Sequence, residues 1–126
     1  MKTSTLIWTA AAVMLLSGCA QKSLYSWGGY DDMLYRQYKD PAQAAEMRTK
    51  LEAHVAQLEQ NKQKAPPGVY AEIGTLYLQS NNKAKSLTYY EKERDAWPES
   101  RALMTAMINN LSRSSSSTAT APAPAP

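Results

Sequence analysis

Prolines divide the central part of the chain into segments that can each form only a short helix. Asp40-Pro41, Pro66-Pro67-Gly68 and Pro98 interrupt the region between residues 27 and 112. Proline ends helices because it lacks an amide hydrogen and its ring clashes with the preceding turn. Between these breaks, apolar residues recur every three or four positions, and no alternating run indicates a strand. We therefore predict one all-α domain over residues 27–112, a bundle of about five helices.

The first short helix is expected to follow Gly28-Gly29. Tyr30, Leu34 and Tyr38 recur at intervals of four and fall near one face, so helical spacing alone explains them as core residues. Tyr35 lies off this stripe and is the better candidate for contact with a partner. The alternative is that Trp27, Tyr30, Tyr35 and Tyr38 form a platform that stacks on a sugar or binds a protein, because such side chains bury a large area at low entropic cost.

A second helix is predicted to start at Asp40, with Pro41 at the first helical position and Gln43 as a capping-box partner. Its apolar stripe comprises Ala44, Met47, Leu51, Val55 and Leu58. The expected pairs on its other faces are Glu46 with Lys50, and Glu59 with Lys62 or Gln63.

The third and fourth helices are predicted to form a hairpin. An apolar face runs from Val69 to Tyr77, a polar turn follows, and the partner helix spans residues 83–96. The 34-residue window 67–100 resembles one tetratricopeptide repeat, a helical-hairpin unit. The residues that fall on the pattern of this repeat are Tyr70, Ile73, Gly74, Tyr77, Ser86, Tyr90 and Pro98.

The resemblance to a tetratricopeptide repeat implies that Gly74 permits close approach of the paired helices. Glu93 departs from the pattern, which has Ala there, and Asn81 replaces the usual turn glycine. Such units bury their faces by stacking, and about three are usually required, so the flanking helices must cap a single repeat. By the same resemblance, the positions that would line a concave groove and bind a partner are Ala71, Thr75, Leu78 and Gln79.

The last helix is predicted to begin at Glu99-Ser100. Its apolar side would carry Leu103, Met104, Met107, Ile108 and Leu111. Residues 113–126 are rich in Ser, Ala and Pro and contain nothing that packs a core, so we expect a disordered tail. A tail of this composition can serve as a stiff spacer, as a ligand for another protein, or only for solubility.

Residues 1–18 have the layout of a signal peptide. Lys2 supplies an early positive charge, Leu6 to Leu16 form an apolar stretch, and Ser17-Gly18 are small. Eleven residues of helix cover roughly 16 Å, about half the hydrocarbon thickness of a bilayer, which disfavours a permanent transmembrane anchor. Residues 19–26 are then expected to form a short tether.

The sequence Leu16-Ser17-Gly18-Cys19 resembles the lipobox of bacterial lipoproteins. The resemblance implies that residues 1–18 are removed and that Cys19, the only cysteine, receives a diacylglycerol on sulfur and an acyl chain on its new amino group. Each buried methylene contributes about 0.8 kcal/mol, so two or more chains hold a protein stably on a bilayer. Ala20 follows, where lipoproteins retained in the inner membrane have Asp; the resemblance therefore implies the periplasmic face of the outer membrane.

Two separated blocks also resemble a family of small, uncharacterised Gram-negative envelope lipoproteins that carry a domain of unknown function. The residues that support the resemblance are 24–30, Leu34-Tyr35, 38–41, 90–93 and 97–100. The resemblance implies an envelope assembly in which the partner is another lipoprotein or a channel subunit like the curli secretion channel. It implies no activity.

The residue types argue against catalysis and against nucleic-acid binding. Without Lys2 the chain carries 13 basic and 11 acidic side chains, which is too balanced for a nucleic-acid footprint. His54 is the only histidine, so multi-ligand His/Cys metal sites and a Ser-His-Asp triad lack material, and a partly buried position on a helix is expected for it. The mixed charges from Glu91 through Glu93 to Arg101 indicate a solvated face. We expect no enzyme, metal, cofactor or small-molecule substrate.

The sequence therefore predicts a lipid-anchored periplasmic module that binds an envelope protein as an accessory or scaffold. The alternative is a lipoprotein that binds or activates the machinery of peptidoglycan synthesis.

Overall fold

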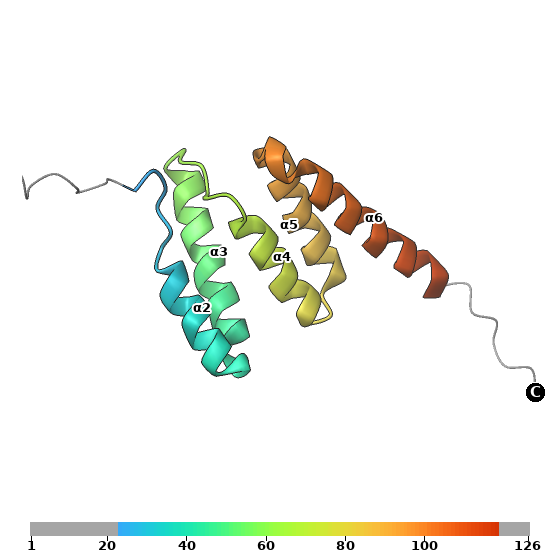
Figure 1. The fold of residues 1–126 in the computed structure, drawn as a ribbon, viewed down its shortest axis with the longest axis horizontal. Coiled ribbons are helices and arrows are strands. Elements are labelled where there is room, and N and C mark those ends of the chain that lie inside the picture. Colours follow the sequence, from blue (N-terminus) through green and yellow to red (C-terminus); the bar gives the residue numbers. More distant parts are fainter. Residues whose placement is uncertain (1–22, 119–126) are drawn as a thin grey trace, which may run out of the picture.

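The computed structural model describes residues 23–118, which form five α-helices and two short 3-10 helices (Figure 1). In chain order these are α2 (Tyr30–Lys39), η1 (Pro41–Gln43), α3 (Ala44–Gln60), α4 (Val69–Gln79), α5 (Lys83–Ala96), η2 (Pro98–Ser100) and α6 (Arg101–Thr118). The described residues contain no strand, so the predicted all-α class is confirmed. Helix α6 continues past the domain boundary expected at residue 112. The signal peptide, Cys19 and residues 119–126 lie outside the described residues.

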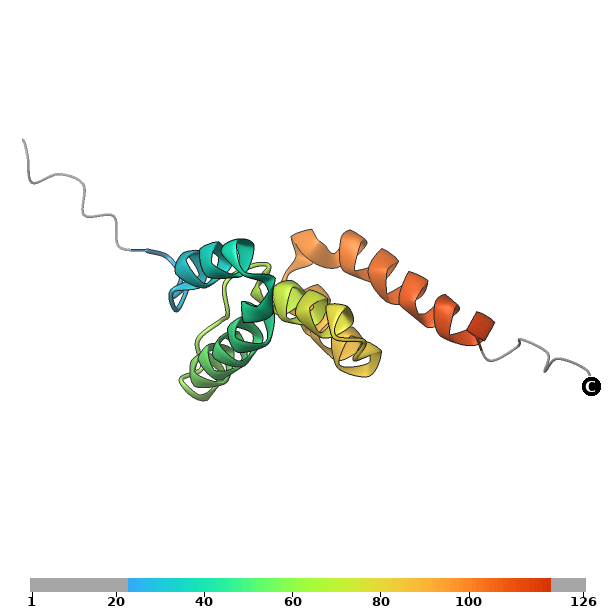
Figure 2. The ribbon, with the colours of Figure 1, turned by 90° about the horizontal axis from the view of Figure 1, so that it is seen from below.

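The helices stack one after another along the chain. Helix α2 packs on α3, α3 on α4, α4 on α5 and α5 on α6, with the α4–α5 hairpin in the middle (Figure 1). Seen from below, α2 and α3 diverge on one side of the hairpin and α6 leaves it on the other (Figure 2). The two terminal helices, α2 and α6, therefore each have one main neighbour.

The hairpin is closed by a glycine contact and a left-handed turn. A Cβ atom built on Gly74 would lie 2.7 Å from two carbons of the Tyr90 ring and 3.2 Å from the Ser86 carbonyl oxygen. Only glycine fits there without moving the fully buried Tyr90. In the turn, Asn81 has φ +58, a left-handed conformation that asparagine tolerates better than most residues. Asn81 can therefore take the place of the turn glycine.

The hydrophobic core is built mainly from α3 and α4. The predicted stripe of α3 is confirmed: Met47, Leu51, Val55 and Leu58 are buried and Ala44 packs against them. The face contributed by α4 comprises Val69, Tyr70, Ile73, Leu76 and Tyr77.

The predicted inward face of α2 is wrong for Leu34 and Tyr38, whereas Tyr30 packs against the core as expected. Met33 is the buried residue, Tyr30 and Gln37 are half-buried, and Leu34 and Tyr38 are 42% and 83% exposed. Residues 30, 33 and 37 make one helical face. Because α3 is the main helical neighbour of α2, mainly that face is covered.

The predicted apolar side of α6 is mostly confirmed. Met104 is buried, and Met107, Ile108 and Leu111 are half-buried on the same face; Leu103, 63% exposed, is the exception. Helix α6 has α5 as its main neighbour, so a narrow stripe is covered.

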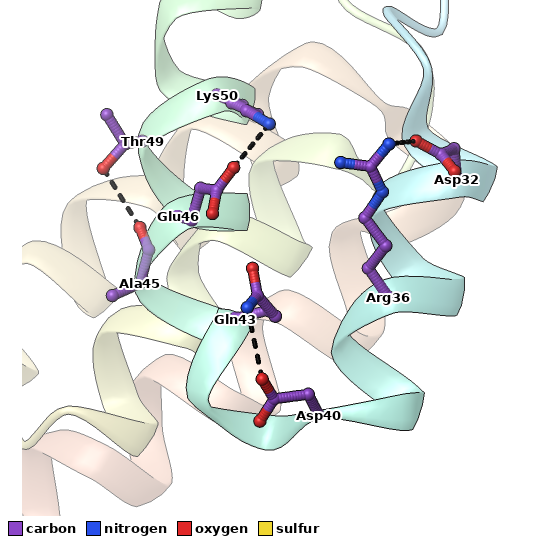
Figure 3. A network of polar contacts seen from close by, with 8 residues as sticks. All are labelled: Asp32, Arg36, Asp40, Gln43, Ala45, Glu46, Thr49 and Lys50. Carbon is purple, nitrogen blue, oxygen red and sulfur yellow. Dashed lines mark hydrogen bonds and ion pairs between the residues drawn. The ribbon is translucent and has the colours of Figure 1, made fainter.

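The corner between α2 and α3 begins with the predicted Asp40 cap (Figure 3). The Ala42 amide donates to Asp40 Oδ1 at 3.0 Å, and the Gln43 side-chain amide donates to Asp40 Oδ2 at 3.2 Å. Gln43 reaches the Asp40 side chain rather than its amide, because that amide already donates to the Arg36 carbonyl at 2.9 Å. The predicted Glu46–Lys50 pair is confirmed at 2.6 Å.

Candidate functional site

A groove between α2 and α4 is the candidate functional site. It has a volume of about 470 Å³. Its lining residues are Leu34, Gln37 and Tyr38 from α2, Pro41 from η1, Ala44 from α3, and Glu72 and Gln79 from α4. A second recess of about 330 Å³ shares Pro41, Ala44 and Gln79 and adds Arg48, among others, so the two hollows form one continuous surface.

The geometry of the groove follows from local sequence. The Asp40-Pro41 corner turns the chain so that the end of α2 faces the start of α3. Leu34 and Tyr38 are four residues apart and therefore lie on one side of α2, where they form an apolar wall. Alanine at position 44 leaves space where a longer side chain would fill the hollow.

Glu72 gives the groove its charge. It is the only Asp, Glu, Lys or Arg in α4 and is half-buried. Its carboxylate has no hydrogen-bond or ion-pair partner among residues 23–114, and burial raises its pKa. The pKa of Tyr30 is raised by burial and, to a smaller extent, by the charge of Glu72. A carboxylate of this kind in a hollow is typical of a functional site.

The structure brings one of the predicted partner-binding residues into the groove. Gln79 lines it and is exposed, whereas Ala71, Thr75 and Leu78 are half-buried on α4 outside its lining. The Thr75 hydroxyl is already engaged, 2.9 Å from the Ala71 carbonyl oxygen and 3.1 Å from the Tyr90 hydroxyl. Tyr35 is 61% exposed, with the Lys39 ammonium 5.7 Å from its ring, and does not line the groove.

Sequence reasoning missed Leu34 and Glu72 as groove residues, and it included Tyr38 among binding residues only in the alternative of an aromatic platform. Helical spacing correctly placed Leu34 and Tyr38 on one face but assigned that face to the core. For Glu72 a signal was present, since a single charged residue interrupts an otherwise uncharged helix.

A separate network of tyrosines and carboxylates joins α3 to the hairpin. Glu52 Oε1 accepts hydrogen bonds from the Tyr77 hydroxyl at 2.7 Å and the Tyr89 hydroxyl at 2.8 Å. The pKa of Tyr89 is raised by burial first and by its bond to Glu52 second. The network therefore fixes α3 against both helices of the hairpin.

The expected pairing of Glu59 with Lys62 or Gln63 is wrong. Glu59 Oε1 accepts from the Tyr70 hydroxyl at 2.8 Å and from the Lys92 ammonium at 3.0 Å. The hydrogen bond from Lys92 is the main cause that lowers the pKa of Glu59. Contacts of this kind come from helix packing and not from spacing along one helix.

Glu93 was predicted on a solvated face, and this is also wrong. Its side chain is fully buried, and its Oε1 accepts from the Gly68 amide and from the Ser100 hydroxyl, both at 2.9 Å. These bonds join the start of α4 to the turn before α6. Glu93 thus has a structural role.

The segment before α2 is held on the domain by two contacts. His54 is half-buried, and its Nε2 atom lies 2.8 Å from the carbonyl oxygen of Ser26. The rings of Tyr25 and Trp97 pack edge to face, with their centroids 5.6 Å apart. Gly28 has φ +59, and a Cβ there would lie 2.6 Å from the His54 ring. His54 therefore packs against the backbone of this segment.

Within residues 23–118, no three His, Cys, Asp or Glu side chains are grouped to hold a metal ion. None of the described helices combines the length and apolar character required to cross a membrane.

Helices stacked in chain order, with a surface groove between α2 and α4, define an all-α domain. Residues 24–107 match the model of a protein family described as a domain of unknown function, DUF4810. The match covers well over half of the 126 residues, so the chain belongs to this family. This confirms the resemblance to a small family of unknown function. No curated protein and no solved structure matches the chain.

Proposed function

We propose that the protein is a lipid-anchored, non-enzymatic interaction module of the Gram-negative envelope, at the periplasmic face of the outer membrane. Its partner is an envelope protein, such as another lipoprotein or a channel subunit, that docks in the groove between α2 and α4. The observation that carries this proposal is the exposure of Leu34 and Tyr38 beside the unpaired Glu72. Exposed apolar side chains next to polar groups are typical of protein-binding surfaces.

The anchor in this proposal is Cys19, with acyl chains on its sulfur and amino group. The seven residue-to-residue steps from Cys19 to Ser26 span at most about 25 Å when extended. His54 holds Ser26 on α3, about 15 Å along that helix from Ala44 in the groove. The tether would therefore keep the domain near the bilayer, which raises its effective concentration for other membrane-bound proteins.

Site-specific photocrosslinking in intact cells tests the proposal. A photoreactive amino acid at Tyr38, in the groove, is compared with one at Leu103, an exposed apolar position on α6. We expect one envelope protein, identified by mass spectrometry, to be crosslinked from position 38 and not from position 103. Cys19→Ser should release the chain from the membrane fraction and abolish the crosslink.

Two results would contradict the proposal. One is a mature chain that carries an unmodified Cys19 thiol in the soluble fraction. The other is crosslinking of the same proteins from positions 38 and 103. Co-sedimentation of the purified chain with sacculi would instead favour the role in peptidoglycan synthesis.

A further inference from the structure

Glu72 is the least compensated charge in the groove. Taking a carboxylate partly out of water costs free energy unless a cation or hydrogen-bond donors replace the lost solvation. Within residues 23–114 no such group bonds to it, and burial raises the pKa of its carboxyl group. A half-buried carboxylate without a partner suits a site in which the ligand supplies the cation.

The nearby cations of the chain are engaged elsewhere. Arg36 points toward Asp32, and their side chains meet at 2.7 Å (Figure 3). Lys39 lies over the Tyr35 ring. Arg48 donates to the Ser80 hydroxyl at 3.1 Å and lies 4.5 Å from the centre of the Tyr77 ring. None of them neutralises Glu72.

The surroundings of Glu72 also limit what can bind beside it. Leu34 and Tyr38 offer an exposed apolar wall, and Gln37 and Gln79 offer amides that can pair with a peptide backbone. Arg48 lines the adjoining recess, so a second cation would be repelled at that end. A ligand must therefore place its cation at Glu72 and apolar groups along α2.

We infer that the groove recognises a protein segment that places a lysine or arginine on Glu72 and apolar side chains on Leu34 and Tyr38. This inference rests on the proposed function, since it specifies the part of the partner that docks. The charge pair would supply specificity, because a neutral residue leaves Glu72 half-buried and unpaired. The apolar contacts would supply most of the buried area.

The test uses the full chain in detergent micelles and a displayed library of random dodecapeptides. We expect peptides selected on the wild-type chain to contain Lys or Arg next to apolar residues. The most enriched peptide is then synthesised, together with a version in which norleucine replaces the basic residue. Binding is measured by fluorescence anisotropy.

A double-mutant cycle isolates the charge pair. We expect Glu72→Gln, or norleucine in the peptide, to weaken binding about tenfold each, and the two together to weaken it little further. Leu34→Ala should also weaken binding several-fold. Glu91→Gln, on the exposed part of α5, is the matched charge control and should change nothing.

The inference is overturned if no peptide is enriched, if the enriched peptides lack a basic residue, or if Glu72→Gln leaves their binding unchanged. If a second copy of the chain bound to the wild type but not to Glu72→Gln, the basic segment that docks in the groove would come from the protein itself. The peptide assay needs no lipid anchor, whereas crosslinking in cells does. If the chain is crosslinked from position 38 while the double-mutant cycle shows no coupling between Glu72 and the basic residue of the peptide, the inference is refuted and the proposed function is left standing.

Discussion

Three tyrosines of the α4–α5 hairpin and two tyrosines of α2 have opposite surroundings. Tyr70, Tyr77 and Tyr90 are at most 7% exposed, whereas Tyr35 and Tyr38 are 61% and 83% exposed. The hairpin lies between α3 and α6, and α3 is the main helical neighbour of α2. Burial of a tyrosine therefore depends on whether the tertiary structure covers its face of the helix: Tyr30, on the covered face of α2, is half-buried and packs against the core.

The two regions therefore have different tasks. In the hairpin, tyrosine hydroxyls bond to Glu52 and Glu59 of α3, so the residues hold the fold together. On α2, the side chains remain open for contact with another molecule. Substitutions in the hairpin should reduce the free energy of unfolding, and substitutions on the open side of α2 should reduce binding.

The largest effect is expected from Gly74→Val. The new side chain would overlap the Tyr90 ring, which is fully buried and has no room to move. Overpacking at such a contact should reduce the free energy of unfolding by about 3 kcal/mol, measured by urea denaturation. The control is Ala53→Val at an exposed position of α3, which should cost about 0.5 kcal/mol. Equal losses in both variants would show that the two helices do not meet closely at Gly74.

Glu93→Ala should cost about 2 kcal/mol. It removes the acceptor for the Gly68 amide and the Ser100 hydroxyl and leaves a cavity. The tetratricopeptide pattern has Ala at this position, so the pattern alone would predict a gain in stability. Glu91→Ala, on the exposed part of α5, should stay within about 0.5 kcal/mol. A more stable Glu93→Ala variant would contradict the role of this carboxylate in joining α4 to the turn before α6.

Glu93 also marks the limit of what the sequence could predict. Local rules placed the helices well: the prolines, the Asp40 cap and the stripe of α3 agree with the structure, and the predicted helix over residues 83–96 matches α5. Spacing cannot show which face of a helix finds a neighbour. Glu93 was therefore predicted to be a surface charge, and Tyr38 was predicted to be a core residue.

The candidate site was harder to predict than the fold. Gln79 was proposed from the resemblance to a tetratricopeptide repeat and does line the groove. Leu34 and Tyr38 join it only because the corner at Asp40 turns α2 back along α3. Glu72 is seven residues from Gln79 in the same helix, but its lack of a partner depends on where every nearby cation lies in space.

A smaller effect, of opposite sign, is expected from Glu72→Gln. Burial raises the folded-state pKa of Glu72 above its ordinary value of 4.5, so folding favours the protonated form. The resulting stability is fully present below pH 4.5 and is lost as the pH rises through the folded-state pKa. At pH 7 the Gln variant should therefore be more stable than wild type by a few tenths of a kcal/mol, because solvent screens a half-exposed group.

Urea denaturation of the Glu72→Gln variant from pH 4 to pH 8 measures this difference, which should vanish near pH 4. Glu91→Gln controls for the loss of a carboxylate from the surface. If Glu72→Gln were less stable than wild type at pH 7, Glu72 would have a stabilising partner within the chain and would need no cation from a ligand.

The smallest effect on stability is expected from Tyr38→Ala. The side chain is 83% exposed near the end of α2, so its removal should change the free energy of unfolding by less than about 0.5 kcal/mol. Binding of the selected peptide should nevertheless weaken about tenfold, because an exposed aromatic residue beside a charged hollow is a common hot spot. Tyr35→Ala is the matched control: it removes an exposed tyrosine from the same helix, outside the groove, and should affect neither quantity. If both variants weakened peptide binding equally, α2 would bind through a broad aromatic surface and not specifically through the groove.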